Sequence, residues 1–197
     1  MKPSESIKPH LIIMVGIPRS GKSFFAEHFA ETFKAPIVSF DQLRKKIFTN
    51  PSFNNDEDEI VAKVADHVLD EVLKTKRTII YEGRTNLRNE RALISKKAHD
   101  AGYVPLFIWV QTETLAAQKR AIKSSLEKPS LSIDEFNIKL KHFSAPHQNE
   151  KAIVISGKHT YASQLKIVLK HLIHPRTIDA ETANPVRPPM NRNFLIR

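Results

Sequence analysis

The chain contains no cysteine, which excludes disulfides, cysteine-ligated zinc, iron–sulfur clusters and thiol catalysis. It has five glycines in 197 residues, whereas average usage gives roughly 14, so each glycine is expected to have a specific role. The longest N-terminal apolar run is far shorter than the roughly 20 residues of a membrane span. Residues 1–10 carry no signal-peptide pattern. These absences are typical of a cytoplasmic protein with no membrane or disulfide-linked partner.

Positive charge, in contrast, is abundant. The 31 Lys and Arg residues exceed the 21 Asp and Glu residues and give a net charge of +10. This excess favours polyanionic partners such as nucleic acid or nucleotides, and a generally basic soluble surface explains it equally well. An apolar share of 41% with 26% charged residues indicates one globular domain.

Short apolar runs alternate with helical patterns along the chain. The expected strands are 11–15, 36–40, 78–81, 104–110 and 152–155, and the expected helices are 22–33, 42–48, 56–74, 89–101, 114–126, 133–143 and 160–173. The alternation predicts an α/β fold with a five-stranded, mainly parallel sheet and helices on both faces. Phe25, Phe29, Phe33 and Trp109 are expected in the core.

Composition divides the chain into three segments. A polar lead, 1–10, precedes a domain at 11–174 that includes a small helical lid at about 120–145. The segment 175–197 has four of the 12 prolines, four arginines and no periodicity, and is expected to be an extended basic tail. The acidic run 54–59 opens a helix, where negative charge suits the macrodipole, and needs no metal.

One motif decides the class of protein. The segment from Gly16 to Ser23 reads G-x-x-x-x-G-K-S, and it lies between an expected strand and an expected helix, as a P-loop requires. Its backbone amides and the helix N-terminus can surround phosphates, Lys22 can reach the β- and γ-phosphates, and the Ser23 hydroxyl can hold Mg²⁺. The expected ATP-binding residues are Gly16, Ile17, Pro18, Arg19, Ser20, Gly21, Lys22, Ser23 and Phe24.

The chain lacks the N-K-x-D motif of GTPases and the L-S-G-G-Q motif, and one short domain is too small for a typical AAA+ motor. Small P-loop kinases remain. Asp41 ends the second expected strand, beside the P-loop strand, and could accept a proton from an attacking hydroxyl. Arg44, three residues further on, could position the acceptor. The alternative is that Asp41 only caps the following helix.

Three segments together resemble a family. The P-loop, the pair Asp41 and Arg44, and the stretch 81–91 are similar to the polynucleotide-kinase-like and zeta-toxin-like P-loop kinases, which have an adenylate-kinase-type fold. The resemblance covers about residues 10–173. It implies an ATP-dependent kinase with Mg²⁺ as cofactor and a hydroxyl acceptor, either a nucleic-acid 5′ end or a small molecule. It also implies that Lys22, Asp41 and Arg120 are catalytic and that Arg44 contacts the acceptor.

The sequence departs from this family at two places. Glu82, which would reach Mg²⁺ through water, stands one residue earlier relative to Thr85-Asn86 than the carboxylate of many relatives. The lid is poor in arginine, with Ser124 and His142 where relatives often have arginine. The alternative function is therefore a nucleotide-binding regulatory or interaction protein with little catalysis. Arg84, Arg88 and Arg91 either line the acceptor pocket or form a solvated helix face.

Overall fold

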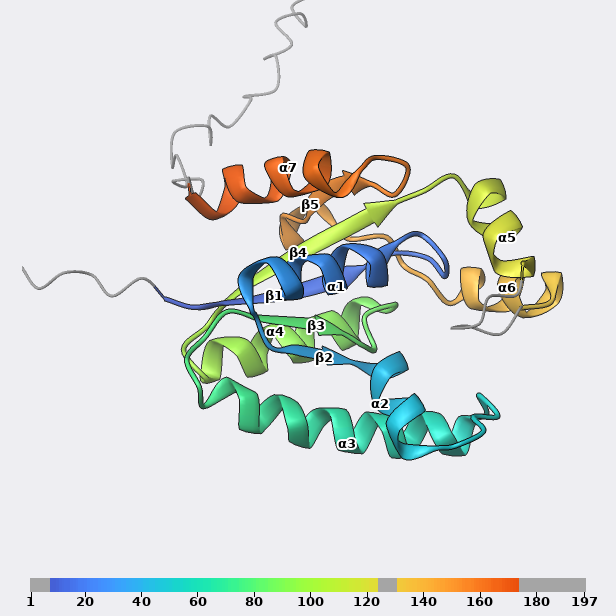
Figure 1. Cartoon of the computed structure of the whole chain (residues 1–197), viewed down its shortest axis with the longest axis horizontal. Coiled ribbons are helices and arrows are strands. Elements are labelled where there is room, and N and C mark those ends of the chain that lie inside the picture. The colour runs from blue at the N-terminus through green and yellow to red at the C-terminus, as the bar shows by residue number, and fades with distance from the viewer. Residues whose placement is uncertain (1–7, 124–130, 174–197) are drawn as a thin grey trace, which may run out of the picture.

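The computed structural model describes residues 8–123 and 131–173 of the chain. Five strands form one sheet in the order β2-β3-β1-β4-β5, and every neighbouring pair is parallel (Figure 1). The strands are β1 (His10–Val15), β2 (Ile37–Ser39), β3 (Ile79–Glu82), β4 (Val104–Gln111) and β5 (Ile153–Ser156). The predicted sheet is confirmed, and each strand end lies within one residue of its expected position.

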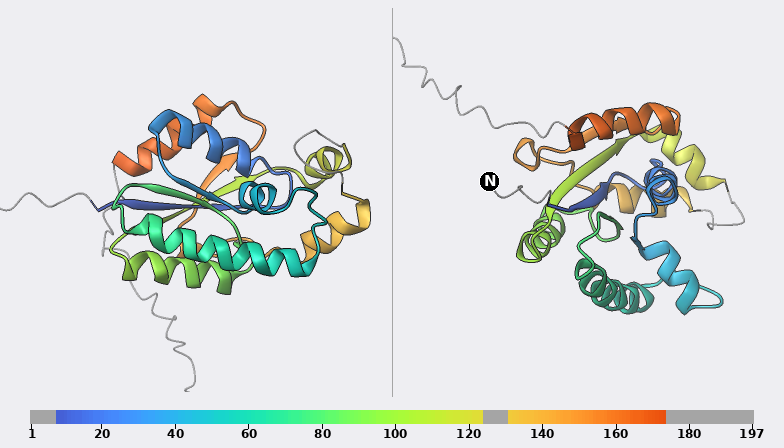
Figure 2. Two further views of the ribbon diagram at one scale, coloured as in Figure 1. Left: turned by 60° about the horizontal axis from the view of Figure 1, so that its bottom comes forward. Right: turned by 60° about the vertical axis from the view of Figure 1, so that its left-hand side comes forward.

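Helices cover both faces of the sheet (Figure 2). Helices α1 (Lys22–Phe33) and α7 (Tyr161–Ile173) pack on one face, over a core that includes Ile12 and Met14 of β1. Helices α3 (Asn55–Leu73) and α4 (Arg88–Asp100) pack on the other, over Leu11, Ile13 and Val15. All five of these β1 side chains are fully buried, because helices cover both faces of the sheet. A strand in this position is apolar on both sides, as the run from Leu11 to Val15 is.

Three short helices lie at the end of the sheet where the strands terminate (Figure 1). Helix α2 (Phe40–Ile47) follows β2, and α5 (Thr114–Ile122) follows β4. Helix α6 (Ile133–Lys141) precedes a 3₁₀ turn at Gln148–Glu150. Ala117 and Ala121 of α5 and Phe136 of α6 form a small core with Ile17 of the P-loop. The helices of the expected lid therefore pack directly against the P-loop.

Some expectations need correction or fall outside the described residues. Phe33 was expected in the core but is 44% exposed at the end of α1, while Phe25 and Phe29 are buried. Trp109 packs against the core but is only partly buried. The end of the helix expected at 114–126 and the segment 175–197 lie outside the described residues. In the described ranges, no helix is long and apolar enough to cross a bilayer.

Candidate functional site

The P-loop joins β1 to α1 in a tight backbone turn. Gly16 has φ +150°, and a Cβ atom there would lie 2.7 Å from both the Ser20 hydroxyl and the Val110 carbonyl oxygen. Only glycine fits this position. Lys22, the first residue of α1, donates from Nζ to the carbonyl oxygens of Gly16 at 2.9 Å and Ile17 at 3.0 Å. The ammonium group therefore lies over the loop that the motif assigns to phosphate.

The ends of β4 and β5 support the loop from behind. The Thr112 hydroxyl donates to the Ser20 carbonyl oxygen at 2.8 Å. A Cβ atom at Gly157 would lie 2.0 Å from the same oxygen, so this glycine permits a close backbone approach. Within the described part of the chain, the buried Ser20 hydroxyl has no hydrogen-bond partner. A loop with a free buried hydroxyl is suited to an additional polar group.

Glu82 connects the P-loop helix to the end of the sheet. It is the last residue of β3 and is 8% exposed. Ser23 donates to Glu82 Oε1 at 2.6 Å, and Ser39 donates to Oε2 at 3.3 Å. The sequence proposed Ser23 and Glu82 for Mg²⁺, and the structure brings them together. Ser39 was not identified, and its strand was expected beside the P-loop strand, which is wrong because β3 lies between β2 and β1.

Asp41 lies in the first turn of α2 and not at the end of a strand, because β2 stops at Ser39. The Ser39 side chain is the N-cap and accepts from the Gln42 backbone amide at 3.5 Å. Ser39 therefore occupies the capping position that was the alternative role of Asp41. The Asp41 side chain is partly buried where α2 begins.

Arg44 points from α2 into the first turn of α3. Its guanidinium donates to Glu57 at 3.0 Å and also pairs with Asp58, and it lies 5.0 Å from the centre of the Phe53 ring. The arginine side chain is 6% exposed. In this arrangement its donors serve the α2–α3 contact, a role that the spacing between Asp41 and Arg44 did not reveal.

The Glu57 carboxylate accepts hydrogen bonds from the loop before α3 in addition to the one from Arg44. Its carboxylate accepts from the Ser52 hydroxyl and backbone amide, each at 2.7 Å, and from the Phe53 amide at 2.9 Å. The side-chain and backbone hydrogen bonds from Ser52, followed by those from Phe53 and Arg44, lower the pKa of Glu57 to about 2. The carboxylate is therefore ionised at any ordinary pH. The acidic run thus contains a buried structural carboxylate in addition to solvated ones.

The three arginines after β3 have different environments. Arg84 is exposed and donates to the Asp58 carbonyl oxygen at 3.2 Å, with Glu59 at 3.9 Å. Arg88 is exposed at the start of α4. Arg91 is fully buried and makes a bidentate pair with Glu150, with Nε 3.0 Å from Oε1 and Nη2 3.0 Å from Oε2. Neither interpretation offered for Arg91, a pocket lining or a solvated face, is correct.

Arg91 also donates from Nη1 to the backbone carbonyl oxygens of Thr85, Asn86 and Ser144, at 3.0, 3.2 and 2.9 Å. It therefore fixes the loop that follows Glu82 and joins it to the segment before β5. A fully buried arginine is common only where its charge and donors are satisfied. Sequence reasoning missed this residue because its carboxylate partner lies 59 positions away.

Arg120 reaches the P-loop from α5. One guanidinium nitrogen lies 3.5 Å from the carbonyl oxygen of Arg19, and the other lies 3.3 Å from that of Gly157. The lid arginine expected from the sequence is therefore placed beside the phosphate loop. Arg120 is the only arginine between positions 114 and 145.

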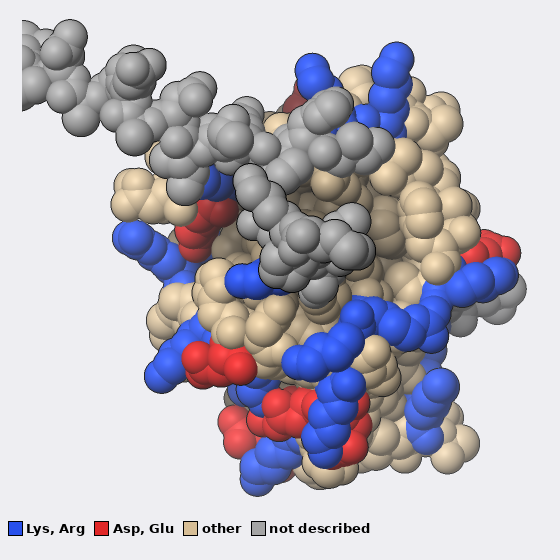
Figure 3. Space-filling view, turned by 90° about the vertical axis from the view of Figure 1, so that its left-hand side faces the viewer, with Lys and Arg blue, Asp and Glu red and all other residues tan. Residues whose placement is uncertain are grey.

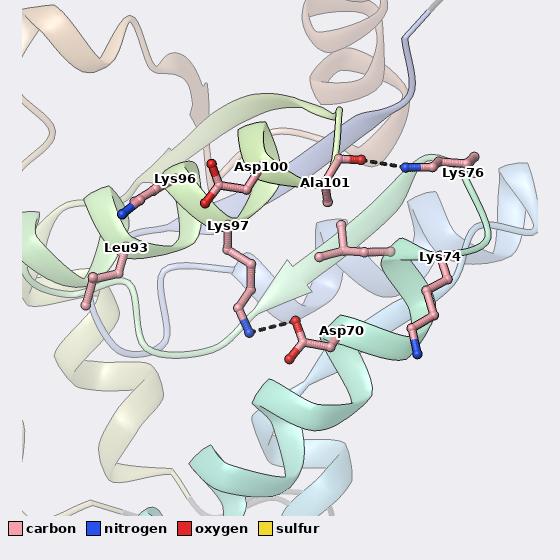
Figure 4. Close-up of a pocket in the computed structure, with 9 residues that line it drawn as sticks. Asp70, Lys74, Lys76, Leu93, Lys96, Lys97, Asp100 and Ala101 are labelled. Atoms are coloured by element: carbon pink, nitrogen blue, oxygen red, sulfur yellow. Dashed lines mark hydrogen bonds and ion pairs between the residues drawn. The ribbon is translucent and has the colours of Figure 1, made fainter.

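Among the cavities formed by the described residues, two lie at opposite ends of the sheet. One of about 480 Å³ adjoins the P-loop and is lined by Ile17, Trp109, Phe143, Val154 and the ends of β4 and β5. The other, of about 550 Å³, lies between the C-terminal halves of α3 and α4 (Figure 4). Its lining includes Lys74, Lys76, Lys96, Lys97, Asp70 and Asp100. Basic side chains interspersed with acidic ones gather on the lower part of this face of the molecule (Figure 3).

The fold and the phosphate loop define a P-loop kinase-like protein, and comparison gives its family. A family model described as an AAA domain matches residues 11–137, and the chain belongs to this family. No curated protein matches the chain.

Solved structures share the fold at low sequence identity. A gluconokinase from Sinorhizobium meliloti 1021 is 14% identical, with 86% of this chain and 94% of that chain covered and a TM-score of 0.61. Chaetomium thermophilum Kti12, in complex with ADP-AlF3, is 16% identical over 81% and 96%, with a TM-score of 0.62. A chain of the Pnkp1/Rnl/Hen1 RNA repair complex is 22% identical over 82% and 49%, with a TM-score of 0.59.

Proposed function

We propose that the protein is an ATP-dependent phosphotransferase that moves the γ-phosphoryl group of ATP to a hydroxyl of a nucleic-acid end, a nucleotide or a small metabolite. The observation that carries this proposal is the Ser23–Glu82 contact of 2.6 Å beside Lys22. It places a hydroxyl and a carboxylate at the mouth of a phosphate loop. The kinases among the structural neighbours support the reaction type.

The residues at the loop fit Mg²⁺-ATP. Hydroxyl and carboxylate oxygens are the ligands that Mg²⁺ prefers, so Ser23 and Glu82 would hold the ion, directly or through water. Mg²⁺ would neutralise charge on the β- and γ-phosphates. Lys22 would exchange its contacts with the Gly16 and Ile17 carbonyl oxygens for contacts with phosphate oxygens. The Ser20 hydroxyl, which has no hydrogen-bond partner among the described residues, fits such a polar ligand.

The proposed transfer needs few groups, because phosphoryl transfer depends mainly on positioning and charge neutralisation. The acceptor oxygen forms a bond to the γ-phosphorus, and the bond from that phosphorus to the β,γ-bridging oxygen breaks. The hydroxyl proton passes to the Asp41 carboxylate, and ADP leaves. Arg120, beside Arg19 and Gly157, would neutralise the transferred phosphoryl group. The assigned domain and lid boundaries and the cytoplasmic location remain predictions.

Transfer of label from γ-labelled ATP tests the activity. The acceptors are 5′-hydroxyl DNA and RNA, nucleosides, sugars and amino-sugar nucleotides. We expect Lys22→Ala to lower transfer at least about 100-fold, because one lost donor to the transferred group has an effect of that size. Lys63→Ala, at an exposed position of α3, is the matched control and should keep full activity. Full activity in Lys22→Ala would contradict the proposal.

A second candidate is a nucleotide-binding regulatory or interaction protein with little catalysis. The single arginine at positions 114–145 favours it, because that residue already contacts two backbone carbonyl oxygens. ATP binding without transfer to any acceptor, together with unchanged partner binding in Asp41→Asn, would support this candidate. Transfer that is lost in Asp41→Asn would exclude it.

A further inference from the structure

We infer that Ser39 and Phe40, at the corner where β2 turns into α2, are positioning residues that hold the start of α2 in a fixed relation to the Glu82 carboxylate. The inference rests on the proposed phosphotransferase function and deepens it, because α2 carries the proposed base Asp41 and Glu82 is the proposed Mg²⁺ contact. Two independent contacts support it, one polar and one steric.

Ser39 provides the polar contact. It is 2% exposed and lies opposite Glu82 in the parallel pairing of β2 with β3. Its hydroxyl donates to Glu82 Oε2 at 3.3 Å and accepts from the Gln42 backbone amide at 3.5 Å. A serine hydroxyl can donate and accept at the same time. The side chain that caps α2 therefore also holds Glu82.

Glu82 is held from two sides. Ser23 of α1 donates to Oε1 at 2.6 Å while Ser39 donates to Oε2, and the residue is 8% exposed. A buried carboxylate with a donor on each oxygen has a defined orientation. Loss of the Ser39 hydroxyl would remove the donor to Oε2, and the carboxylate could then turn away from the P-loop more easily.

Phe40 provides the steric contact. It is the first residue of α2, and its ring meets the Tyr81 ring edge-on, with the centroids 6.1 Å apart and an angle of 80° between the planes. A Cβ atom at Gly83 would lie 2.4 and 2.6 Å from two Phe40 ring carbons and 2.6 Å from the Tyr81 hydroxyl. These distances are far below van der Waals contact, so the ring fits here because residue 83 is glycine.

The two contacts act on adjacent residues. Ser39 and Phe40 immediately precede Asp41, and their partners Glu82 and Gly83 are neighbours at the end of β3 and just after it. A shift of the start of α2 along β3 would therefore break both contacts together. Phosphoryl transfer depends on how the acceptor is placed relative to the phosphate, so this corner would set that placement.

Removal of the Ser39 hydroxyl tests the polar contact. Ser39→Gly is suitable because glycine is itself tolerated at an N-cap, whereas Ser39→Thr keeps the hydroxyl. Asn54→Gly is the matched control, since the Asn54 side chain caps α3 through the Glu57 amide at 2.9 Å. With γ-labelled ATP and the best acceptor of the panel above, we expect kcat to fall at least about tenfold in Ser39→Gly and less than about twofold in the other two variants. Equal kcat in Ser39→Gly and Asn54→Gly would overturn the inference.

Gly83→Ala tests the steric contact, because the added methyl group would displace Phe40. It is made in the wild type and in a Phe40→Val, Tyr81→Phe background, which lacks the atoms that the methyl group would meet. We expect Gly83→Ala to lower kcat at least about tenfold in the wild type and less than about threefold in that background, because effects of residues in contact are not additive. An equal loss in both backgrounds, or no loss in the wild type, is incompatible with the inference.

Calorimetry with ATP separates this inference from the kinase function, because it requires no acceptor. The Kd for ATP is measured with Mg²⁺ and with EDTA. We expect Ser39→Gly to raise the Kd with Mg²⁺ at least about tenfold, as for supporting groups at metal sites, and to leave the Kd with EDTA unchanged. Wild-type values in both conditions would overturn the inference even if transfer occurs. Failure of the wild type to phosphorylate any acceptor would instead contradict the kinase function, and the two Kd values would still decide whether Ser39 acts on Glu82.

Discussion

Glu82 is the residue on which the nucleotide site depends most directly after Lys22. Its two carboxylate oxygens accept from Ser23 and Ser39, so one side chain joins α1, β2 and β3. The resemblance to known kinases left its role open because it stands one position early in the sequence. The contact with Ser23 supports the proposal that the shift is accommodated by the backbone and that the carboxylate still faces the phosphate loop.

Substitution of Glu82 by Gln removes the charge and leaves one acceptor oxygen, so one of the two serine hydroxyls keeps its acceptor and the other faces an NH2 group. We expect the Mg²⁺ concentration that half-saturates ATP-dependent transfer to rise between about 10- and 100-fold, as for lost ligands or supporting groups at metal sites. Glu31→Gln, at an exposed position of α1, is the control. An unchanged Mg²⁺ dependence in Glu82→Gln would show that this carboxylate does not serve the ion.

The P-loop as an element depends on contacts made by the end of β5. Gly157 lies so close to the loop that an added Cβ atom would be 2.0 Å from the Ser20 carbonyl oxygen and 2.2 Å from the Thr112 hydroxyl. Gly157→Ala should displace the loop, and we expect ATP binding measured by calorimetry to weaken at least about tenfold, since small misplacements at such sites have large effects.

Gly102 provides the control for that substitution. It ends α4 at the other end of the sheet with φ +78°, and an added Cβ atom would meet only Lys76 Nζ at 3.9 Å. Gly102→Ala should cost about 1 kcal/mol of folding stability through backbone strain. Its Kd for ATP should equal that of the wild-type protein. Equal Kd values for both glycine variants would contradict the role given to Gly157.

The junction of α2 and α3 predicts a dependence of stability on pH. Hydrogen bonds from Ser52, Phe53 and Arg44 lower the pKa of Glu57 from 4.5 to about 2. A carboxylate with a lowered pKa stabilises the fold above its unfolded pKa, and this contribution is lost as pH falls through the folded pKa. It should therefore be complete above about pH 4.5 and decline towards pH 2.

Urea unfolding at several pH values measures this effect. The difference in free energy of unfolding between wild type and Glu57→Gln should be constant above about pH 5 and shrink below about pH 4. A difference that stays the same down to pH 2 would show that the folded protein does not favour the ionised form of Glu57.

At the scale of the whole molecule, local sequence patterns predicted the secondary structure and the phosphate loop, whereas contacts between residues far apart in the sequence could not be predicted. The sheet, its helices and the phosphate loop follow from apolar runs and from the fixed spacing of Gly16, Gly21 and Lys22. The partners of Arg44 and Arg91 could not be predicted, because Glu57 and Glu150 lie 13 and 59 positions away, and their meeting depends on how α3 and the segment before β5 fold back. Burial of an arginine has no local signature.

The basic side chains at one end of the molecule and the P-loop at the other form two separate regions that could bind anions. Lys34, Lys74, Lys76, Arg77, Lys96 and Lys97 lie at or just beyond the C-terminal ends of α1, α3 and α4, with Asp70, Glu71 and Asp100 among them. The P-loop lies at the other end of the strands (Figure 1). A single-stranded oligonucleotide bound by this basic surface should therefore not compete with ATP.

Fluorescence anisotropy of a labelled oligonucleotide checks this prediction. Three phosphate contacts would reduce affinity roughly tenfold or more between about 50 and 200 mM salt. Saturating ATP should not displace the oligonucleotide, and Lys22→Ala should bind it as the wild type does. Substitution of the exposed Lys74 and Lys96 by Gln should weaken oligonucleotide binding severalfold without changing ATP binding. Displacement by ATP would instead place the oligonucleotide at the phosphate loop, and the basic end would then contribute solubility alone.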